Sequence, residues 1–235
     1  MNHSAYLQRR EQIENYFDRT AAQAWERLTS NAPVGRIRAT VRAGRDQMRA
    51  TLLSWLPQDM RGLRLLDAGC GTGALAVEAM ARGAEVVAID LSPTLVKLAA
   101  DRYGADPAHP LGGSIRFCSG DMLDEALGHF DHVVAMDSLI HYDVPDMVQA
   151  VQRLADRTRG SILLTFAPRT PLLAAMHGVG RLFPRGDRSP ALTPVAEPAL
   201  RQALEAGIGP QGWREGRSQR IASGFYTSQA WEWTR

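Results

Sequence analysis

The stretch from Leu65 to Gly73 constrains the fold of this chain more than any other. It reads Leu-Leu-Asp-Ala-Gly-Cys-Gly-Thr-Gly, with glycine at every second position from 69 to 73. Glycine adopts backbone angles that other residues avoid, and it lets a ligand approach the main chain closely. The apolar residues before the glycines predict a short strand, and those from Ala74 onward predict a helix. The backbone N–H groups that open this helix would face the ligand.

Two acidic residues accompany this glycine loop. Asp67 stands two positions before the first glycine, and Asp90 ends the next apolar run, Glu85-Val86-Val87-Ala88-Ile89-Asp90. An acid at the end of the second strand is placed to hold a ribose. The dinucleotide fingerprint Gly-x-Gly-x-x-Gly would require glycine where this chain has Ala74, so the spacing disfavours a nicotinamide cofactor. Glycines that only turn the chain would not account for both acids.

Composition restricts the class of protein further. The chain has 235 residues and is 45% apolar, which is enough for one large core, and its net charge of +2 makes nucleic acid an unexpected partner. Its two cysteines, Cys70 and Cys118, are far apart, so we expect neither a disulfide framework nor a protein-bound metal. The polar N-terminus and the lack of an apolar run of about 18 residues predict a cytoplasmic protein with peripheral membrane contact at most.

Alternating strand and helix patterns predict an α/β fold with a mostly parallel sheet. We expect strands near 63–67, 85–90, 114–118, 131–136 and 160–166, and a final hairpin of strands near 213–220 and 225–234. We expect helices within 4–30 and near 35–56, 74–82, 93–103, 144–157, 170–184 and 197–206. Residues 1–58 would then form an N-terminal helical lid, and residues 59–235 the core, with a substrate-covering insertion at about 168–193.

The glycine loop, Asp67 and Asp90 together resemble motif I and its acidic partner in the class I S-adenosylmethionine methyltransferases. The resemblance implies a seven-stranded sheet of order 3-2-1-4-5-7-6, with S-adenosylmethionine as cofactor and S-adenosylhomocysteine as product. In that family the loop cradles the methionine part, and the acid after the second strand binds the ribose. The cofactor-binding residues that it implies are Asp67, Gly69, Cys70, Gly71, Asp90, Leu91, Asp121, Met122 and Met136. Asp121 would bind the adenine amino group, although an Asp that only forms a turn is the alternative.

His141 is the histidine that we single out, because it follows the fourth predicted strand beside the expected methyl position. A structural role and a role in catalysis or substrate contact are both open for it from the sequence. The other histidines are expected in loops or near termini as solvated side chains: His3, His109, His129, His132 and His177. Tyr16, in the N-terminal helical region, has a hydroxyl that could reach a bound substrate.

Three further stretches resemble the magnesium-protoporphyrin IX methyltransferases of chlorophyll and bacteriochlorophyll synthesis. They are Tyr16-Phe17-Asp18-Arg19-Thr20, the arginine-rich run from Arg36 to Arg45, and Ser138-Leu139-Ile140-His141-Tyr142. The resemblance implies methyl transfer to one propionate of magnesium-protoporphyrin IX, giving the monomethyl ester. It places Tyr16 and His141 at the positions of that family's proposed catalytic pair, and it suggests the porphyrin-carrying subunit of magnesium chelatase as a partner.

Such a porphyrin is broad, flat and apolar with two carboxylates. The segment 170–184 and the helix near 35–56 offer apolar surface with arginines at the margins, and arginine pairs well with carboxylates. The expected substrate contacts are Ile37, Arg38, Arg42, Leu139 and Met176. For most arginines of the helix near 35–56, a solvated outer face is the simpler interpretation. The segment 170–184 is also compatible with a plain packing helix or with shallow membrane contact.

Two other functions remain open at the level of sequence. The first is a methyltransferase for another small acceptor, such as a quinone or a different carboxylic acid, because motif I does not identify the acceptor. The second is a protein that binds S-adenosylmethionine without turnover. Tyr16, His141 and the intact glycine loop disfavour the second.

Overall fold

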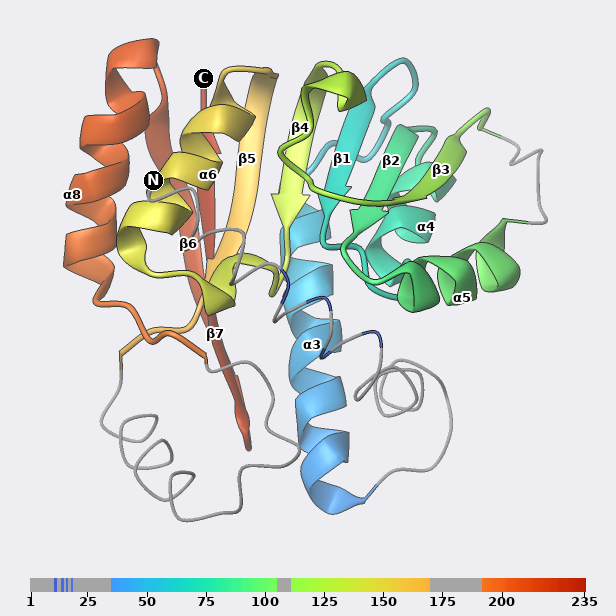
Figure 1. The fold of residues 1–235 in the computed structure, drawn as a ribbon, viewed down its shortest axis with the longest axis horizontal. Coiled ribbons are helices and arrows are strands. Elements are labelled where there is room, and N and C mark those ends of the chain that lie inside the picture. Colours follow the sequence, from blue (N-terminus) through green and yellow to red (C-terminus); the bar gives the residue numbers. More distant parts are fainter. Residues whose placement is uncertain are drawn as a thin grey trace.

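The computed structural model describes residues 35–104, 111–169 and 192–235, together with the single residues Glu11, Glu14, Tyr16 and Asp18. The described residues form a seven-stranded sheet of order β3-β2-β1-β4-β5-β7-β6 (Figure 1). The order predicted from the resemblance is therefore confirmed. The helices expected within 4–30 and near 170–184 lie outside the described residues, apart from the four single ones.

Strands β1 to β5 run parallel, and the last strand in the chain is inserted antiparallel between β5 and β6. Their bounds are β1 Arg64–Ala68, β2 Glu85–Asp90, β3 Ser114–Ser119, β4 Phe130–Ala135, β5 Thr158–Phe166, β6 Arg214–Ser223 and β7 Tyr226–Thr234. The central strands are nearly continuous apolar runs, as expected where helices cover both faces of a parallel sheet. The carboxyl ends of β1, β2 and β4 consequently meet at one edge.

Helices cover both faces of this sheet, and in the described residues three short 3₁₀ turns lie in the connections between elements. Their bounds are α3 Arg36–Trp55, α4 Ala74–Ala81, α5 Pro93–Tyr103, η2 Glu125–Leu127, η3 Leu139–His141, α6 Val144–Ala155, α8 Glu197–Ile208 and η4 Gly209–Gln211. The core residues of α6 and α8 share one apolar cluster, and those of α3 and α4 share the other. Leu65 belongs to the second cluster and Leu66 to the first, because successive strand side chains point to opposite faces.

Local signals set several of these boundaries. Ser92 caps α5 by accepting a hydrogen bond from the Leu95 N–H at 3.2 Å, and Pro93 occupies the first turn. The expected bounds 85–90 and 93–103 are therefore the observed ones. Helix α6 ends two residues earlier than expected, at Ala155, and β5 begins correspondingly earlier because Phe130 pairs with Thr158.

Helix α3 packs against the C-terminal hairpin, far from it in the sequence. A Cβ at Gly44 would lie 2.5 Å from the ring of Tyr226, and one at Gly224 would lie equally close to the hydroxyl oxygen of Thr40. Met48 and Leu52 of α3 are fully buried in the same apolar cluster as β1. Residues 36–55 are therefore fixed to the sheet by close packing.

One expectation about the histidines is wrong. His132 lies within β4, half-buried, and its Nδ1 is 2.8 Å from the Ser161 hydroxyl on the neighbouring strand β5. Burial lowers its pKa. It is a sheet residue with a hydrogen-bonding partner, not a solvated loop histidine.

Candidate cofactor and acceptor site

The loop after β1 bends sharply under the end of β2. The N–H groups of Gly69 and Cys70 both donate to the Ile89 carbonyl, at 2.8 and 3.0 Å. Glycines 69, 71 and 73 all have positive φ, between 53° and 88°. A Cβ at Gly69 would overlap the Ser138 side chain, and one at Gly73 would lie 2.9 Å from the ring of Phe117. Glycine is therefore required here both by the backbone angles and by space.

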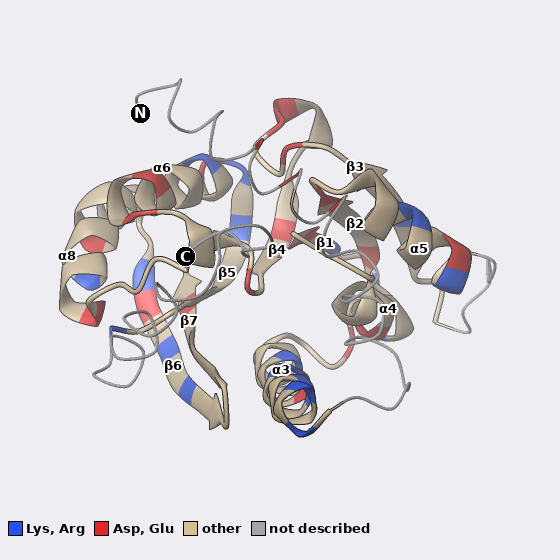
Figure 2. Ribbon diagram, turned by 60° about the horizontal axis from the view of Figure 1, so that its bottom comes forward, with Lys and Arg blue, Asp and Glu red and all other residues tan. Residues whose placement is uncertain are grey.

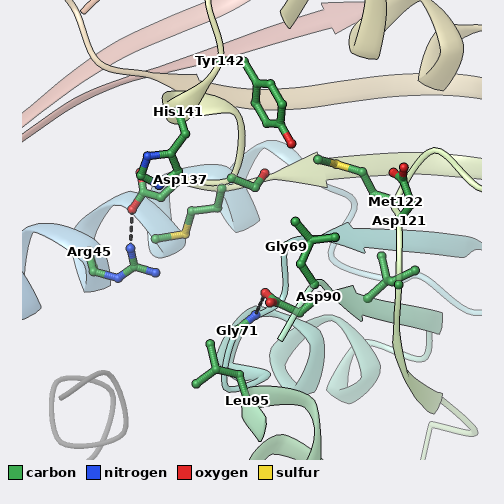
Figure 3. A pocket seen from close by; sticks show the side chains of 15 residues that line it. Arg45, Gly69, Gly71, Asp90, Leu95, Asp121, Met122, Asp137, His141 and Tyr142 are labelled. Atoms are coloured by element: carbon green, nitrogen blue, oxygen red, sulfur yellow. Dashed lines mark hydrogen bonds and ion pairs between the residues drawn. The ribbon is translucent and has the colours of Figure 1, made fainter. Parts of the chain in front are cut away.

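Asp90 ties this loop to the end of β2. Its carboxylate accepts the Gly71 N–H at 2.8 Å and the Ser92 N–H at 2.9 Å (Figure 3). Burial raises the pKa of Asp90, and hydrogen bonds from Ser92 and Gly71 oppose this rise. The carboxylate is thus held in one orientation by backbone amides at the rim of the cavity.

Asp67 lies behind the loop, only 2% exposed. Burial raises the pKa of Asp67 to about 7; the nearby charge of Asp90 adds to the rise, and a hydrogen bond from the Ala76 N–H opposes it. Its Oδ2 is buried and accepts no hydrogen bond from the part of the chain that the structure describes. Burial also raises the pKa of the neighbouring Cys70 thiol well above its ordinary value. The Cys70 thiol is therefore not a reactive thiolate at neutral pH, whereas the Asp67 carboxyl is partly ionised there.

These strand ends surround a cavity that is open to solvent on one side (Figure 3). Its lining comes from the loop after β1, the ends of β2, β3 and β4, and helix α3. The residues are Arg45, Gly69, Gly71, Ile89, Asp90, Leu91, Leu95, Gly120, Asp121, Met122, Met136, Asp137, Ser138, His141 and Tyr142. Of the nine expected cofactor-binding residues, all but Asp67 and Cys70 line it.

The cavity fits an adenosyl cofactor on several independent grounds. Gly69 and Gly71 of the glycine loop line the cavity with bare backbone, and Asp90 presents a fixed carboxylate beside them. Asp121 lines the opposite wall, and its Oδ1 accepts the Leu123 N–H at 2.9 Å. Asp121 therefore does form a turn, as the alternative interpretation expected. Asp121 also lines the cavity, so the turn does not rule out adenine binding, which stays a prediction.

His141 lies at the other end of the cavity, in η3, and is 4% exposed. Figure 3 shows its ring beside Asp137 on the same side of the cavity as Arg45. Leu139, two residues earlier, is 0% exposed and belongs to the apolar core under the sheet. The expected substrate contact of Leu139 is therefore corrected, because η3 directs this side chain inward.

The remaining expected contacts are spread more widely. Ile37 and Arg38 lie exposed on α3, Ile37 at 58%, whereas Arg42 on the same helix is half-buried. Figure 2 shows that basic residues recur along this helix. Tyr16 is described as a single half-buried residue, and Met176 lies outside the described residues. In the part of the chain that the structure describes, none of these side chains lines the cavity.

Sequence reasoning missed a network around Asp137. Its carboxylate accepts hydrogen bonds from Arg45 at 2.6 Å and from the Tyr226 hydroxyl at 3.1 Å. Arg45, whose side chain is 19% exposed, is thus an exception to the solvated outer face expected for most of the α3 arginines. No local motif indicates these contacts, because the partners are 92 and 89 residues away in the sequence.

The sheet order, glycine loop and cavity define a class I S-adenosylmethionine-dependent methyltransferase. Comparison with known proteins narrows this class. A family model for a methyltransferase domain matches residues 65–160, and one for the magnesium-protoporphyrin IX methyltransferase C-terminus matches residues 135–235. The chain is 47% identical over 232 residues to a magnesium-protoporphyrin O-methyltransferase from Rhodobacter capsulatus, covering 98% of each chain. It belongs to the magnesium-protoporphyrin O-methyltransferase family.

A solved structure agrees with this assignment. The magnesium-protoporphyrin IX methyltransferase from Synechocystis with bound S-adenosylhomocysteine superposes with a TM-score of 0.81 at 27% identity, over 95% of this chain and 98% of that one. A ubiquinone biosynthesis O-methyltransferase from Xanthomonas oryzae is 40% identical, but over 137 residues and 54% of this chain. Similarity to the quinone enzymes therefore covers about half of the chain.

Proposed function

We propose that this protein transfers the methyl group of S-adenosylmethionine to a propionate carboxylate of magnesium-protoporphyrin IX. The products are the monomethyl ester and S-adenosylhomocysteine, in chlorophyll or bacteriochlorophyll synthesis. The observation that carries the proposal is the 47% sequence identity, over 98% of this chain, to an enzyme named for this reaction. The cavity, with a glycine cradle at one end and His141 at the other, is compatible with it.

The cofactor residues divide by position around the cavity. Gly69 and Gly71 line the cavity where the methionine part would lie, and Asp90 is oriented by two amides to accept hydrogen bonds from the ribose hydroxyls. Asp121 and Met122 would hold the adenine from the end of β3, and Leu91 and Met136 would add apolar walls. Asp67 and Cys70 would act from behind the loop, by supporting its conformation.

The reaction does not require the protein to remove a proton from the acceptor. A propionate should have a pKa near that of Glu, about 4.3, so it is already an anion at neutral pH and needs no general base. S-adenosylmethionine supplies an activated methyl group on a cationic sulfur. Well-oriented reactants gain on the order of 7–11 kcal/mol from proximity alone. We assign Tyr16 and His141 to orienting the carboxylate by hydrogen bonds. His141 is deeply buried at that end of the cavity, where exclusion of water would strengthen these hydrogen bonds.

The porphyrin itself would lie over α3. Exposed Ile37 offers apolar contact, and Arg38 or Arg42 would bind the propionate that is not methylated. Met176 would contribute from the insertion at about 168–193, outside the described residues. In the described part of the chain, no helix combines the length and apolarity that a membrane crossing needs. We extend the proposal to peripheral membrane contact and docking of the magnesium chelatase subunit at this arginine-rich end.

The decisive experiment is to incubate the protein with S-adenosylmethionine and magnesium-protoporphyrin IX and to measure the porphyrin mass. A gain of one methylene supports the proposal. Methylation of a quinone or another acid in a parallel panel would favour another acceptor, and cofactor binding without any product would favour a non-catalytic protein. Replacement of His141 with Ala or Asn, with turnover and porphyrin binding measured separately, tests its role; unchanged turnover would remove it from the mechanism.

A further inference from the structure

We infer that Asp137 is a positioning residue, and that its buried ion pair with Arg45 holds the turn carrying His141 in its working conformation. The turn follows β4 directly and leads into η3. Asp137 and Arg45 both line the cavity, on the side where His141 lies (Figure 3). The catalytic part of this inference rests on the proposed function.

The backbone at Asp137 is strained. Its φ is +54°, and no other non-glycine residue in the described ranges has a positive φ. Residues other than glycine pay for this conformation and keep it only where surrounding contacts enforce it. The strain is located between the end of β4 and the cavity wall formed by Ser138 and His141.

Contacts from three distant elements enforce this conformation. The Asp137 N–H donates to the Thr165 hydroxyl of β5 at 2.7 Å. Its carboxylate accepts Arg45 of α3 at 2.6 Å and the Tyr226 hydroxyl of β7 at 3.1 Å, with the Ser228 hydroxyl at 3.4 Å. Burial, with the Asp137 charge beside it, raises the pKa of Tyr226, so the phenol stays protonated and can donate.

The charge of the pair matters as well as its geometry. The side chains of Asp137 and Arg45 are 5% and 19% exposed, so their charges are poorly screened. The acceptor is itself a carboxylate, and an uncompensated Asp137 would repel it. Arg45 cancels that charge while linking α3 to the turn. Loss of Arg45 therefore both loosens the turn and exposes the incoming anion to Asp137.

The test uses Asp137→Asn, Arg45→Ala and the double variant that combines these two changes. Arg49→Ala is the control. Asn tolerates positive φ, so Asp137→Asn removes mainly the charge. Arg49 lies one turn further along α3, is 24% exposed and pairs with Glu78 and Asp46 away from the cavity, which makes it the matched control. Each purified protein is assayed for kcat, for the porphyrin KM and for S-adenosylhomocysteine affinity.

We expect kcat to fall about ten-fold in each single variant and no further in the double, because groups that act as one unit are not additive. The porphyrin KM should rise in Arg45→Ala and return toward the original value in the double variant. S-adenosylhomocysteine affinity should stay within about two-fold throughout. Losses that multiply in the double variant, or a folded Asp137→Asn protein with unchanged kcat, would overturn the inference.

Hydrogen exchange supplies a readout that does not depend on activity. Amides of residues 136–142 should exchange faster in Asp137→Asn than in Arg49→Ala, while those of β4 stay protected. If the unmodified protein leaves magnesium-protoporphyrin unmethylated, the proposed function fails and the exchange result still decides whether Asp137 holds the turn. Unchanged exchange over 136–142 would contradict that positioning.

Discussion

Replacing Asp67 with Asn should change the pH dependence of stability in a way that the structure makes quantitative. Asp67 is 2% exposed, and burial raises its pKa to about 7 from an ordinary 3.8. Between these two values the unfolded chain has lost the proton that the folded chain keeps. At 1.36 kcal/mol per pH unit, the difference amounts to roughly 4 kcal/mol.

The sign follows from the raised value. The contribution of Asp67 to stability is complete below pH 4 and is lost as the pH rises toward 7, because the folded state binds more protons over this range. Asn carries no titrating proton, so this loss disappears in Asp67→Asn. Relative to the unmodified protein, the variant should gain about 4 kcal/mol of unfolding free energy between pH 4 and pH 8.

Urea unfolding at pH 4.5, 5.5, 6.5 and 7.5, without cofactor, measures this difference. A constant cost of packing Asn at position 67 drops out, because only the change with pH is compared. Asp59→Asn is the control: hydrogen bonds from Arg61 lower the pKa of exposed Asp59 to about 2, so its contribution should be flat over the same range. A flat difference for Asp67→Asn would refute the reasoning about burial.

Three other outcomes follow from the site. Gly69→Ala should weaken S-adenosylhomocysteine binding at least ten-fold, measured by calorimetry, because the added Cβ would meet Ser138. Gly62→Ala is the control: Gly62 has a similar positive φ but no atom within 4 Å of the added Cβ, so this change should lower stability alone. Arg157→Met should lower the midpoint of thermal unfolding and weaken cofactor binding, because Arg157 donates to the buried carbonyl of Met122; unchanged affinity would show that this end of the cavity is held by other contacts. Fluorescence titrations from pH 5.5 to 8 measure the affinities of cationic S-adenosylmethionine and neutral S-adenosylhomocysteine. The first should gain affinity relative to the second as buried Asp67 ionises. Affinities that change in parallel with pH would contradict an effect of the Asp67 charge on the cofactor.

Local chemistry explains what could be predicted from the sequence. The glycine loop and the Ser92-Pro93 cap depend on neighbouring residues, and Asp90 ends the next strand, so the local sequence was enough to predict them. The expected sheet order came from a family resemblance, and the pairing of β5 with β7 confirms the part that periodicity alone left open. The residues that line the cavity from the strand ends could be predicted for the same reason.

What escaped prediction depends on contacts between distant segments. Asp137 joins α3, β5 and β7, and no spacing along the chain indicates a positive φ at an aspartate. Leu139 and His141 are two residues apart in one stretch, but the 3₁₀ turn sends the first into the core and leaves the second at the cavity. His132 falls within the strand expected near 131–136, but the register of β4 against β5, which the sequence does not show, is what places Ser161 beside it.

The insertion of β7 between β5 and β6 has a consequence for how the molecule is made. Strand β5 emerges from the ribosome long before the segment that pairs with it, and Ile162 and Leu164 find Trp233 and Trp231 opposite them only when β7 has been synthesised. Until then β5 presents an unpaired apolar margin, the kind of surface on which nascent chains associate wrongly. We therefore expect translation arrested before Tyr226 to yield chains that require a chaperone to stay dispersed.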